Sequence, residues 1–205
     1  MNILDDEVAI QHSQPDLSEA PFYKMTPDFV LDAVESLGFI SDARIYSLNS
    51  YENRVYQVGI EDGEPLIAKF YRPKRWSLAQ ILEEHAFSLE LAVNEVPVVM
   101  PLEIKSKTLF HYNGYDFALF PRRGGRAPEL DCEDTIYALG QSLGRIHALG
   151  QLHTFEHRPS LNRVSFGEQS CEYLLSQNCI PKSLLDAYKT ITSQLLQKMR
   201  PPLQL

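Results

Sequence analysis

A lysine inside a strand-like segment is the residue of this sequence best placed to do chemistry. Lys69 lies in the run Leu66-Ile-Ala-Lys-Phe-Tyr71, and the next helical pattern carries the acidic pair Glu83 and Glu84. A strand lysine whose amine is fixed by a helix carboxylate places a positive charge where phosphate groups can bind. A polar turn at residues 49–53 can cover such phosphates with backbone N–H groups and hydroxyls. The pattern favours a phosphate-binding site, and the alternative is a solvated edge-strand lysine beside a solvated helix face.

Helical periodicity and capping residues predict the elements that carry the acids. Thr26-Pro27-Asp28 is typical of a helix start, with threonine as N-cap and proline in the first turn. Ser77 and Gln80 form a capping-box pattern ahead of the helix that contains Glu83 and Glu84. Four helices are predicted, over residues 27–37, 78–93, 134–149 and 183–199.

Strand-like segments dominate the first half of the chain, and helices follow. Glu61-Asp62-Gly63 and Asn113-Gly114 favour β-hairpin turns. Five strands are predicted, over residues 44–48, 54–60, 65–71, 109–112 and 115–120. This order predicts an α+β fold, in which a five-stranded antiparallel sheet with its helix precedes a helical part. The predicted divisions are an acidic flexible leader at 1–25, the sheet lobe at 26–121, and a linker with helices at 122–205.

Composition and charge exclude several classes of protein. With 205 residues, 44% of them apolar, the chain can form a core without disulfides or metals. The net charge is −8, and no basic surface of the kind a general nucleic-acid binder needs is evident. No apolar run approaches the ~20 residues of a membrane span, and the N-terminus lacks the pattern of a signal peptide. The three cysteines contain no C-x-x-C pair, which predicts reduced thiols of a cytosolic protein and no zinc site.

Other residues of chemical interest have plainer interpretations. The basic runs Arg72–Arg75 and Arg122–Arg126 are suited to anions, but a solvated turn and a solvated linker are favoured. His147 could bind a metal with the two histidines after it, but a packed or helix-capping role is favoured. Trp76 could stack on a base, although a half-buried anchor for the following helix is favoured. The acidic leader is interpreted as solubilising rather than as a partner-binding tail.

Six segments of the chain together resemble one known family. They are Leu48-Asn-Ser-Tyr-Glu-Asn-Arg-Val-Tyr-Gln57, Ala68-Lys-Phe-Tyr-Arg-Pro73, Gln80-Ile-Leu-Glu-Glu-His85, Asn94-Glu-Val-Pro-Val98, Phe117-Ala-Leu-Phe-Pro121 and Leu143-Gly-Arg-Ile-His147. In this order and spacing they are similar to the stress-response kinase A group of bacteria, within the aminoglycoside-phosphotransferase and choline-kinase-like superfamily. The resemblance implies a protein-kinase-like N-lobe and the first helices of an incomplete C-lobe. It also implies a cytoplasmic serine/threonine protein kinase that uses ATP and magnesium, acts on a protein substrate and supports stress survival.

Position by position, the resemblance implies an ATP site. Lys69 would be the phosphate-binding lysine and Glu84 its partner, because the spacing from Glu84 to Val96-Pro97 fits the superfamily; Glu83 is the second choice. The polar turn would stand in for a glycine-rich loop. Residues 117–121 would form the hinge, whose backbone holds adenine and whose side chains wall it. The implied ATP-binding residues are Ser50, Tyr51, Asn53, Lys69, Glu84, Phe117, Leu119 and Phe120.

The catalytic part of the family's pattern is missing from these 205 residues. In the family, a His-Gly-Asp loop is followed by an asparagine five residues after its aspartate, and a later aspartate binds magnesium. No histidine here precedes Gly-Asp, and Asp186 is the only aspartate beyond Gly150. We interpret the sequence as a truncated kinase with no catalytic residue or metal ligand and expect no phosphoryl transfer from it.

Two alternatives stay open at this point. The chain could be a non-catalytic pseudokinase fragment that binds nucleotide or a partner. It could also belong to a relative that phosphorylates a small-molecule hydroxyl. In either case the apolar faces of the late helices are expected to be partly exposed.

Overall fold

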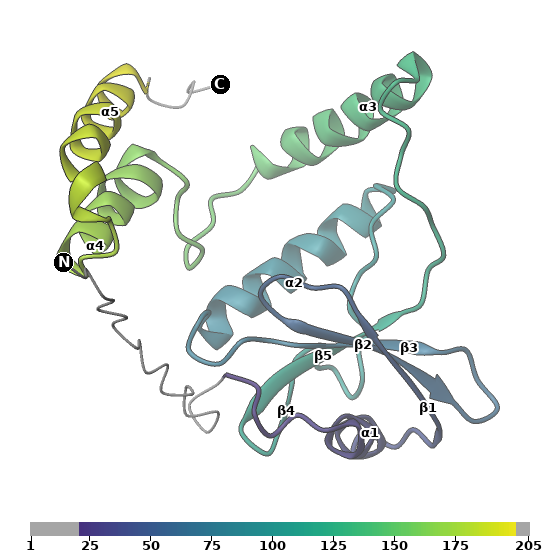
Figure 1. Ribbon diagram of the computed structural model, residues 1–205. Coiled ribbons are helices and arrows are strands. Elements are labelled where there is room, and N and C mark those ends of the chain that lie inside the picture. The colour runs from purple at the N-terminus through teal and green to yellow at the C-terminus, as the bar shows by residue number, and fades with distance from the viewer. Residues whose placement is uncertain (1–20, 200–205) are drawn as a thin grey trace, which may run out of the picture. The chain divides into compact units, whose positions relative to one another are not determined.

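The computed structural model describes residues 21–199, which form two compact units divided between His153 and Thr154. The elements of the first unit are α1 (Pro27–Glu35), β1 (Ser41–Leu48), β2 (Arg54–Ile60), β3 (Leu66–Phe70), α2 (Leu78–Val93), β4 (Phe110–Tyr112), β5 (Tyr115–Pro121) and α3 (Glu133–Gly150) (Figure 1). Those of the second unit are η2 (Arg163–Glu168), α4 (Gln169–Ser176), η3 (Lys182–Leu184) and α5 (Leu185–Lys198). The boundary between the units lies further along the chain than the lobe boundary predicted at residues 121 and 122.

The predicted α+β fold with a five-stranded antiparallel sheet is confirmed. The strands pair in the order β1-β2-β3-β5-β4, and every pairing is antiparallel. The β4–β5 hairpin turns at Asn113 and Gly114, whose φ angles of 42° and 93° require the left-handed region that Asn-Gly favours. Strand β1 begins at Ser41, earlier than predicted, and its register shifts between Ser41 and Ile45. In this strand order, β3 lies in the centre of the sheet, between β2 and β5.

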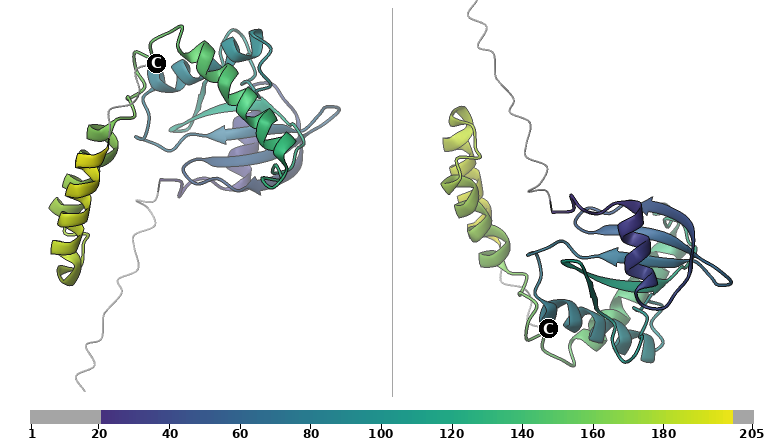
Figure 2. Two further views of the ribbon diagram at one scale, coloured as in Figure 1. Left: turned by 90° about the horizontal axis from the view of Figure 1, so that it is seen from above. Right: turned by 90° about the horizontal axis from the view of Figure 1, so that it is seen from below.

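The two faces of the sheet have different cores. Helix α1 packs against one face, where Val30 and Val34 meet Phe70, Phe117 and Leu119 in a cluster of buried side chains. Helix α2 packs against the other, as the views in Figures 1 and 2 show. There Ile81 of α2 belongs to a second buried cluster with Tyr71 and Ala118. Because side chains alternate along a strand, β3 and β5 contribute residues to both cores.

The chain before α1 is tied to the same sheet. Most of the predicted leader, residues 1–20, lies outside the described residues, and residues 21–25 form a turn. Within that turn the ring of Phe22 stacks on Tyr115, with ring centroids 6.1 Å apart. The N–H of Phe29 then donates a 3.2 Å hydrogen bond to the Thr26 hydroxyl, as expected of the predicted N-cap. These contacts fix the start of α1 over the hairpin of β4 and β5.

Helix α2 carries the acidic pair and begins as its sequence predicts. The Gln80 N–H donates to the Ser77 hydroxyl at 3.2 Å, and the Ser77 N–H donates to the Gln80 side chain at 2.9 Å. This reciprocal pair satisfies N–H groups that the first turn of a helix cannot bond internally. Buried residues on the inner side of the helix, Ile81, His85 and Leu91, then hold it against the sheet.

Replacing Ser77 with alanine removes one half of this capping box. We expect Ser77→Ala to lower the free energy of unfolding by about 1 kcal/mol, because an N–H of the first turn loses its partner. Urea denaturation followed by circular dichroism measures the change. Ser47→Ala, on the exposed part of β1, is the matched control and should change stability by less than about 0.5 kcal/mol. Equal losses for both variants would contradict the capping role.

The helices after the sheet expose much of their apolar faces. Helix α3 has no buried residue, and Ile136 and Leu143 are 50% and 54% exposed. The Arg145 guanidinium donates to the carbonyls of Asn94 and Glu95, at 3.0 and 2.9 Å, which ties α3 to the end of α2. In the second unit, Leu195 of α5 is 58% exposed. The predicted helix at 183–199 is present as η3 followed by α5, whereas η2 and α4 have no counterpart among the predicted helices.

Candidate functional site

The amine of Lys69 is held by a carboxylate of α2, the helix that packs against the second face of the sheet. Lys69 Nζ donates a hydrogen bond to Glu84 Oε1 at 3.1 Å, and the two side chains are 23% and 35% exposed. The same amine lies 4.8 Å from the ring centroid of Tyr71 and 6.0 Å from that of Phe120. The contact with Glu84 and the two aromatic rings together hold a positive charge in one place without burying it.

A cavity of about 380 Å³ opens beside this ion pair. It is lined by Val55, Ile67, Lys69, Glu84, His85, Ser88, Val99, Phe120, Pro121 and Arg123. The register of the sheet explains the grouping, because Val55 of β2 lies opposite Lys69 and Ile67 of β3 lies opposite Phe120. The lining joins aliphatic and aromatic side chains to two cationic ones. Such a cavity suits a ligand with a flat apolar part and an anionic part.

The polar turn between β1 and β2 is tied to the segment that follows β3. Arg75 Nε and Trp76 Nε1 both donate to the Glu52 carboxylate, at 2.8 and 2.6 Å. The N–H of Arg72 donates to Asn53 Oδ1 at 3.2 Å. The hydrogen bond from Arg75 is the main cause of a lowered pKa of Glu52, so that carboxylate stays charged at neutral pH. The turn is therefore fastened at two points.

These contacts also bear on two features whose roles were left open. In the basic run Arg72–Arg75, the Arg75 guanidinium is engaged by Glu52 rather than turned toward a ligand. Trp76 is half-buried next to the start of α2, as expected of an anchor.

Of the turn residues implied to bind ATP, Ser50 is half-buried and Tyr51 is fully exposed. Neither they nor Asn53 line the cavity beside Lys69.

Strand β5 places only part of the predicted hinge at the cavity. The Phe120 side chain lines it, next to the ion pair. Phe117 and Leu119 have no exposed surface and pack in the core beneath α1, on the opposite face of the sheet. The expectation that these two side chains wall an adenine is corrected here, because alternate residues of a strand point to opposite faces. Their role is to hold β5 in place. The side chains of Ala118 and Phe120 point to the other face of the sheet, which α2 covers.

Sequence reasoning missed several residues of the cavity. Ile67 and Val55 were identifiable in principle. Ile67 lies on the same face of β3 as Lys69, and Val55 of β2 lies directly opposite Lys69. Val99 comes from the apolar segment after α2, and Arg123 from the linker after β5. Nothing in the local sequence of those two segments indicates that they reach the lysine, because only tertiary packing brings them there.

Within residues 21–199, no three His, Cys, Asp or Glu side chains gather closely enough to hold a metal ion. His153, one of the histidines considered with His147, contacts Glu90 of α2 instead, at 2.7 Å. None of the helices in the described part of the chain has both the length and the apolar character to cross a membrane.

Comparison with known proteins places the chain in a family. The model of the phosphotransferase enzyme family, called APH, matches residues 46–201, which include strands β2 to β5, the ion pair and the later helices. The chain belongs to this phosphotransferase family. Stress response kinase A of Escherichia coli K12 is 40% identical over 175 residues, which are 85% of this chain and 53% of that protein. A protein of Salmonella typhimurium named serine/threonine protein kinase RdoA is equally similar, with the same shares covered.

A solved structure shows the same fold. Amicoumacin kinase, determined in complex with AMP-PNP, Ca²⁺ and Ami, superposes with a TM-score of 0.65 at 21% identity. The superposition covers 86% of this chain and 55% of that one. This superposition confirms the predicted kinase-like fold, and the family model and the curated relatives confirm the predicted family. The chain spans about half the length of the curated relatives it matches.

Proposed function

We propose that this chain supplies the ATP-binding part of a stress-response serine/threonine protein kinase. The observation that carries the proposal is the ion pair of Lys69 and Glu84 at the mouth of a partly apolar cavity. The names of the relatives, stress response kinase A and serine/threonine protein kinase RdoA, support the finer assignment. A protein with this function works where ATP is, in the cytoplasm, and its substrate is a serine or threonine hydroxyl of another protein.

In this proposal each part of the site has one task. Val55, Ile67 and Phe120 contact the adenine, and the Lys69 amine contacts the α- and β-phosphates, with Glu84 fixing its position. The turn at residues 49–53 covers the phosphates from the side of β1 and β2. A divalent cation, when present in such enzymes, neutralises charge on the phosphates. The described residues gather no group of three ligands for such an ion, and the task that this proposal gives them is to bind the nucleotide.

A second candidate is a kinase that phosphorylates a small-molecule hydroxyl. The observation in its favour is the fold shared with amicoumacin kinase. The two candidates differ only in the acceptor of the phosphate. An assay that offers the full-length Escherichia coli relative both a serine-containing protein and a hydroxyl-bearing antibiotic separates them, because only the true acceptor becomes labelled. A non-catalytic fragment that binds nucleotide remains the alternative for the 205-residue chain itself.

Calorimetric titration of the 205-residue chain with AMP-PNP tests the proposal. We expect saturable binding, and no transfer of labelled phosphate from ATP to an added protein substrate, because the sequence holds no His-Gly-Asp loop. A folded chain that binds no AMP-PNP would refute the nucleotide site. Phosphate transfer that requires a divalent cation would instead refute the proposed lack of catalysis by this chain.

A further inference from the structure

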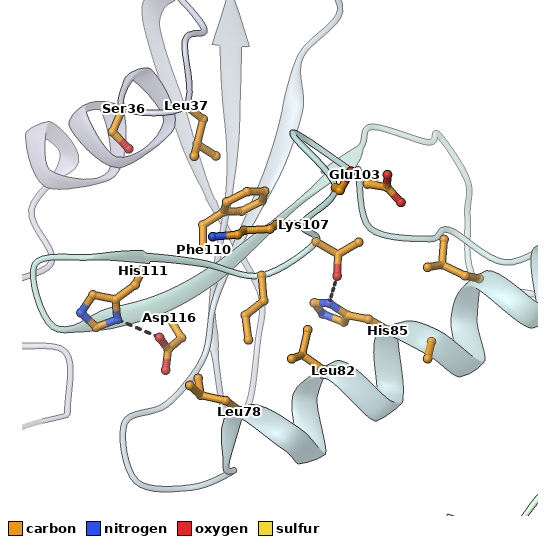
Figure 3. A pocket seen from close by; sticks show the side chains of 15 residues that line it. Ser36, Leu37, Leu78, Leu82, His85, Glu103, Lys107, Phe110, His111 and Asp116 are labelled. Atoms are coloured by element: carbon orange, nitrogen blue, oxygen red, sulfur yellow. Dashed lines mark hydrogen bonds and ion pairs between the residues drawn. The ribbon is translucent and has the colours of Figure 1, made fainter.

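A buried histidine lies directly behind the proposed nucleotide site. His85 follows Glu84 in α2 and is only 2% exposed, which is unusual for a side chain that can carry charge. It lines the cavity beside Lys69 and also a larger cavity of about 870 Å³. Figure 3 shows the second cavity, with His85 reaching into it from α2 among leucine side chains. The imidazole is thus part of the wall between the two cavities.

Both ring nitrogens of His85 have partners on other elements. Nε2 lies 2.7 Å from the hydroxyl of Tyr71, the residue directly after β3. Nδ1 lies 2.9 Å from the hydroxyl of Thr108, in the segment before β4, as the dashed line at His85 in Figure 3 marks. Thr108 is itself buried. One side chain therefore joins α2 to β3 and to the segment before β4.

The bond to Tyr71 leads back to the lysine. The ring whose hydroxyl meets His85 is the ring that lies 4.8 Å from Lys69 Nζ. Glu84, the acid that accepts the hydrogen bond from Lys69, precedes His85 in the same helical turn. His85 is thus linked to two of the groups around the amine: it is the chain neighbour of Glu84, and it shares a hydrogen bond with Tyr71.

We propose that His85 is a positioning residue for Lys69, and that its bonds to Tyr71 and Thr108 set where the amine and its partner Glu84 lie. The inference rests on the nucleotide-binding function proposed above. A histidine suits the task because its two nitrogens point in fixed, opposed directions, which a flexible side chain cannot reproduce. An aliphatic residue would fill the same space but would leave the two hydroxyls without this partner.

The charge state of His85 supports this role. Burial is the main cause of a pKa below its ordinary value of 6.5; Lys69 lowers the pKa further and Glu84 raises it. Besides Tyr71, which contacts the ring, the titratable or charged residues that line the two cavities with His85 are Lys69, Glu84 and Arg123 in the smaller cavity and Glu103, Lys107, His111 and Asp116 in the larger one. At neutral pH the ring is therefore uncharged, so one nitrogen donates and the other accepts.

The test compares His85→Leu with Tyr71→Phe and with the double variant. We expect His85→Leu to weaken AMP-PNP binding about tenfold, as the loss of a bond that orients a charged group does. Tyr71→Phe removes the hydroxyl and keeps the ring near Lys69, and we expect about threefold weaker binding. The double variant should bind AMP-PNP about as weakly as His85→Leu alone, because both changes break the same hydrogen bond between His85 and Tyr71. His111→Leu, an exposed histidine of β4, is the matched control and should bind like the parent chain.

A second readout separates this inference from the function on which it rests. The rate at which an amine-reactive reagent labels Lys69, measured by peptide mass spectrometry, reports the surroundings of the amine whether or not nucleotide binds. We expect His85→Leu to change the labelling of Lys69 severalfold relative to Lys189, while the His111→Leu control leaves it unchanged. If the parent chain binds no AMP-PNP, the proposed function fails, and the labelling still tests His85.

Three outcomes overturn the inference. One is a folded His85→Leu variant with unchanged AMP-PNP affinity and unchanged labelling of Lys69. Another is a double variant in which the fold-losses of AMP-PNP affinity of the two single variants multiply, which would show that His85 and Tyr71 act separately. If His85→Leu does not fold, the milder Tyr71→Phe variant replaces it, and unchanged labelling of Lys69 in that variant contradicts the connection.

The pH dependence of stability gives one more expected result. Because the pKa of His85 is lowered in the folded chain, the unfolded chain takes up the proton first as pH falls below 6.5. The stabilising contribution of the neutral ring is fully present above pH 6.5 and is lost as pH falls through the lowered pKa. Between pH 7 and acidic pH, urea denaturation should show a smaller fall in the free energy of unfolding for His85→Gln than for the parent chain. Parallel curves would show that His85 does not titrate in this way.

Discussion

Replacing Lys69 with alanine is expected to weaken AMP-PNP binding by about 10- to 100-fold, or about 1.4–2.8 kcal/mol. The variant removes the amine that pairs with Glu84 beside the cavity. It also leaves the Glu84 carboxylate without that partner, so a negative charge then faces the phosphates of the ligand. Calorimetry at constant ionic strength measures the loss, since salt screens part of the attraction.

Lys189→Ala is the matched control for this variant. Lys189 is an exposed lysine of α5, and its replacement removes the same charge from a different compact unit. If binding depends on the overall charge of the chain, both variants should lose affinity equally. Unchanged AMP-PNP affinity of a folded Lys69→Ala variant would exclude the proposed phosphate contact.

The largest expected loss of stability comes from Phe70→Ala, at about 3–5 kcal/mol. Phe70 has no exposed surface, and its ring stacks on Phe117 with centroids 5.1 Å apart. Tyr56 and Phe29 approach the same ring from β2 and α1, with centroids at 6.2 and 6.3 Å. Truncation therefore removes buried apolar surface and leaves a cavity at the point where α1 meets the sheet. A loss of this size is a large part of the 5–15 kcal/mol that typically stabilises a domain.

Urea denaturation monitored by circular dichroism measures the effect of Phe70→Ala. Tyr51→Ala is the control, because this aromatic side chain is fully exposed in the turn between β1 and β2. It should change the free energy of unfolding by less than about 0.5 kcal/mol. A loss below about 1 kcal/mol for Phe70→Ala would show that the core collapses around the missing ring, and that the α1 face contributes less than its burial indicates.

The site illustrates how far a local pattern determines function. The strand that carries Lys69, the capped helix that carries Glu84 and the turn between β1 and β2 were all predictable from periodicity and turn residues. Those signals are local, because caps, hairpin turns and alternation depend on residues a few positions apart. The strand and helix pattern predicted that Lys69 pairs with an acid of the next helix, and the family resemblance favoured Glu84 over Glu83. The observed pair joins residues fifteen positions apart.

For strand β5, the local pattern does not predict which side chains face the cavity. Its sequence, Tyr-Asp-Phe-Ala-Leu-Phe-Pro, is apolar on both faces, so alternation cannot tell which face meets a ligand. The structure decides the question, because α1 covers Phe117 and Leu119 while Phe120 borders the cavity. The polar turn shows the same limit. Its tie to Arg75 and Trp76 joins residues more than twenty positions apart, and no repeat or cap predicts it.

By itself, the sequence determined the order of the five strands and of helices α1, α2, α3 and α5, the caps that begin α1 and α2, the hairpin at Asn113-Gly114 and the family to which the chain belongs. Each of these depends on neighbours along the chain or on a set of ordered motifs. The tertiary structure alone decided which side chains of β5 face the cavity, how the polar turn is fastened and that His85 stands behind Lys69. The physical reason is that burial, long-range pairing and the meeting of two faces exist only when distant segments pack together.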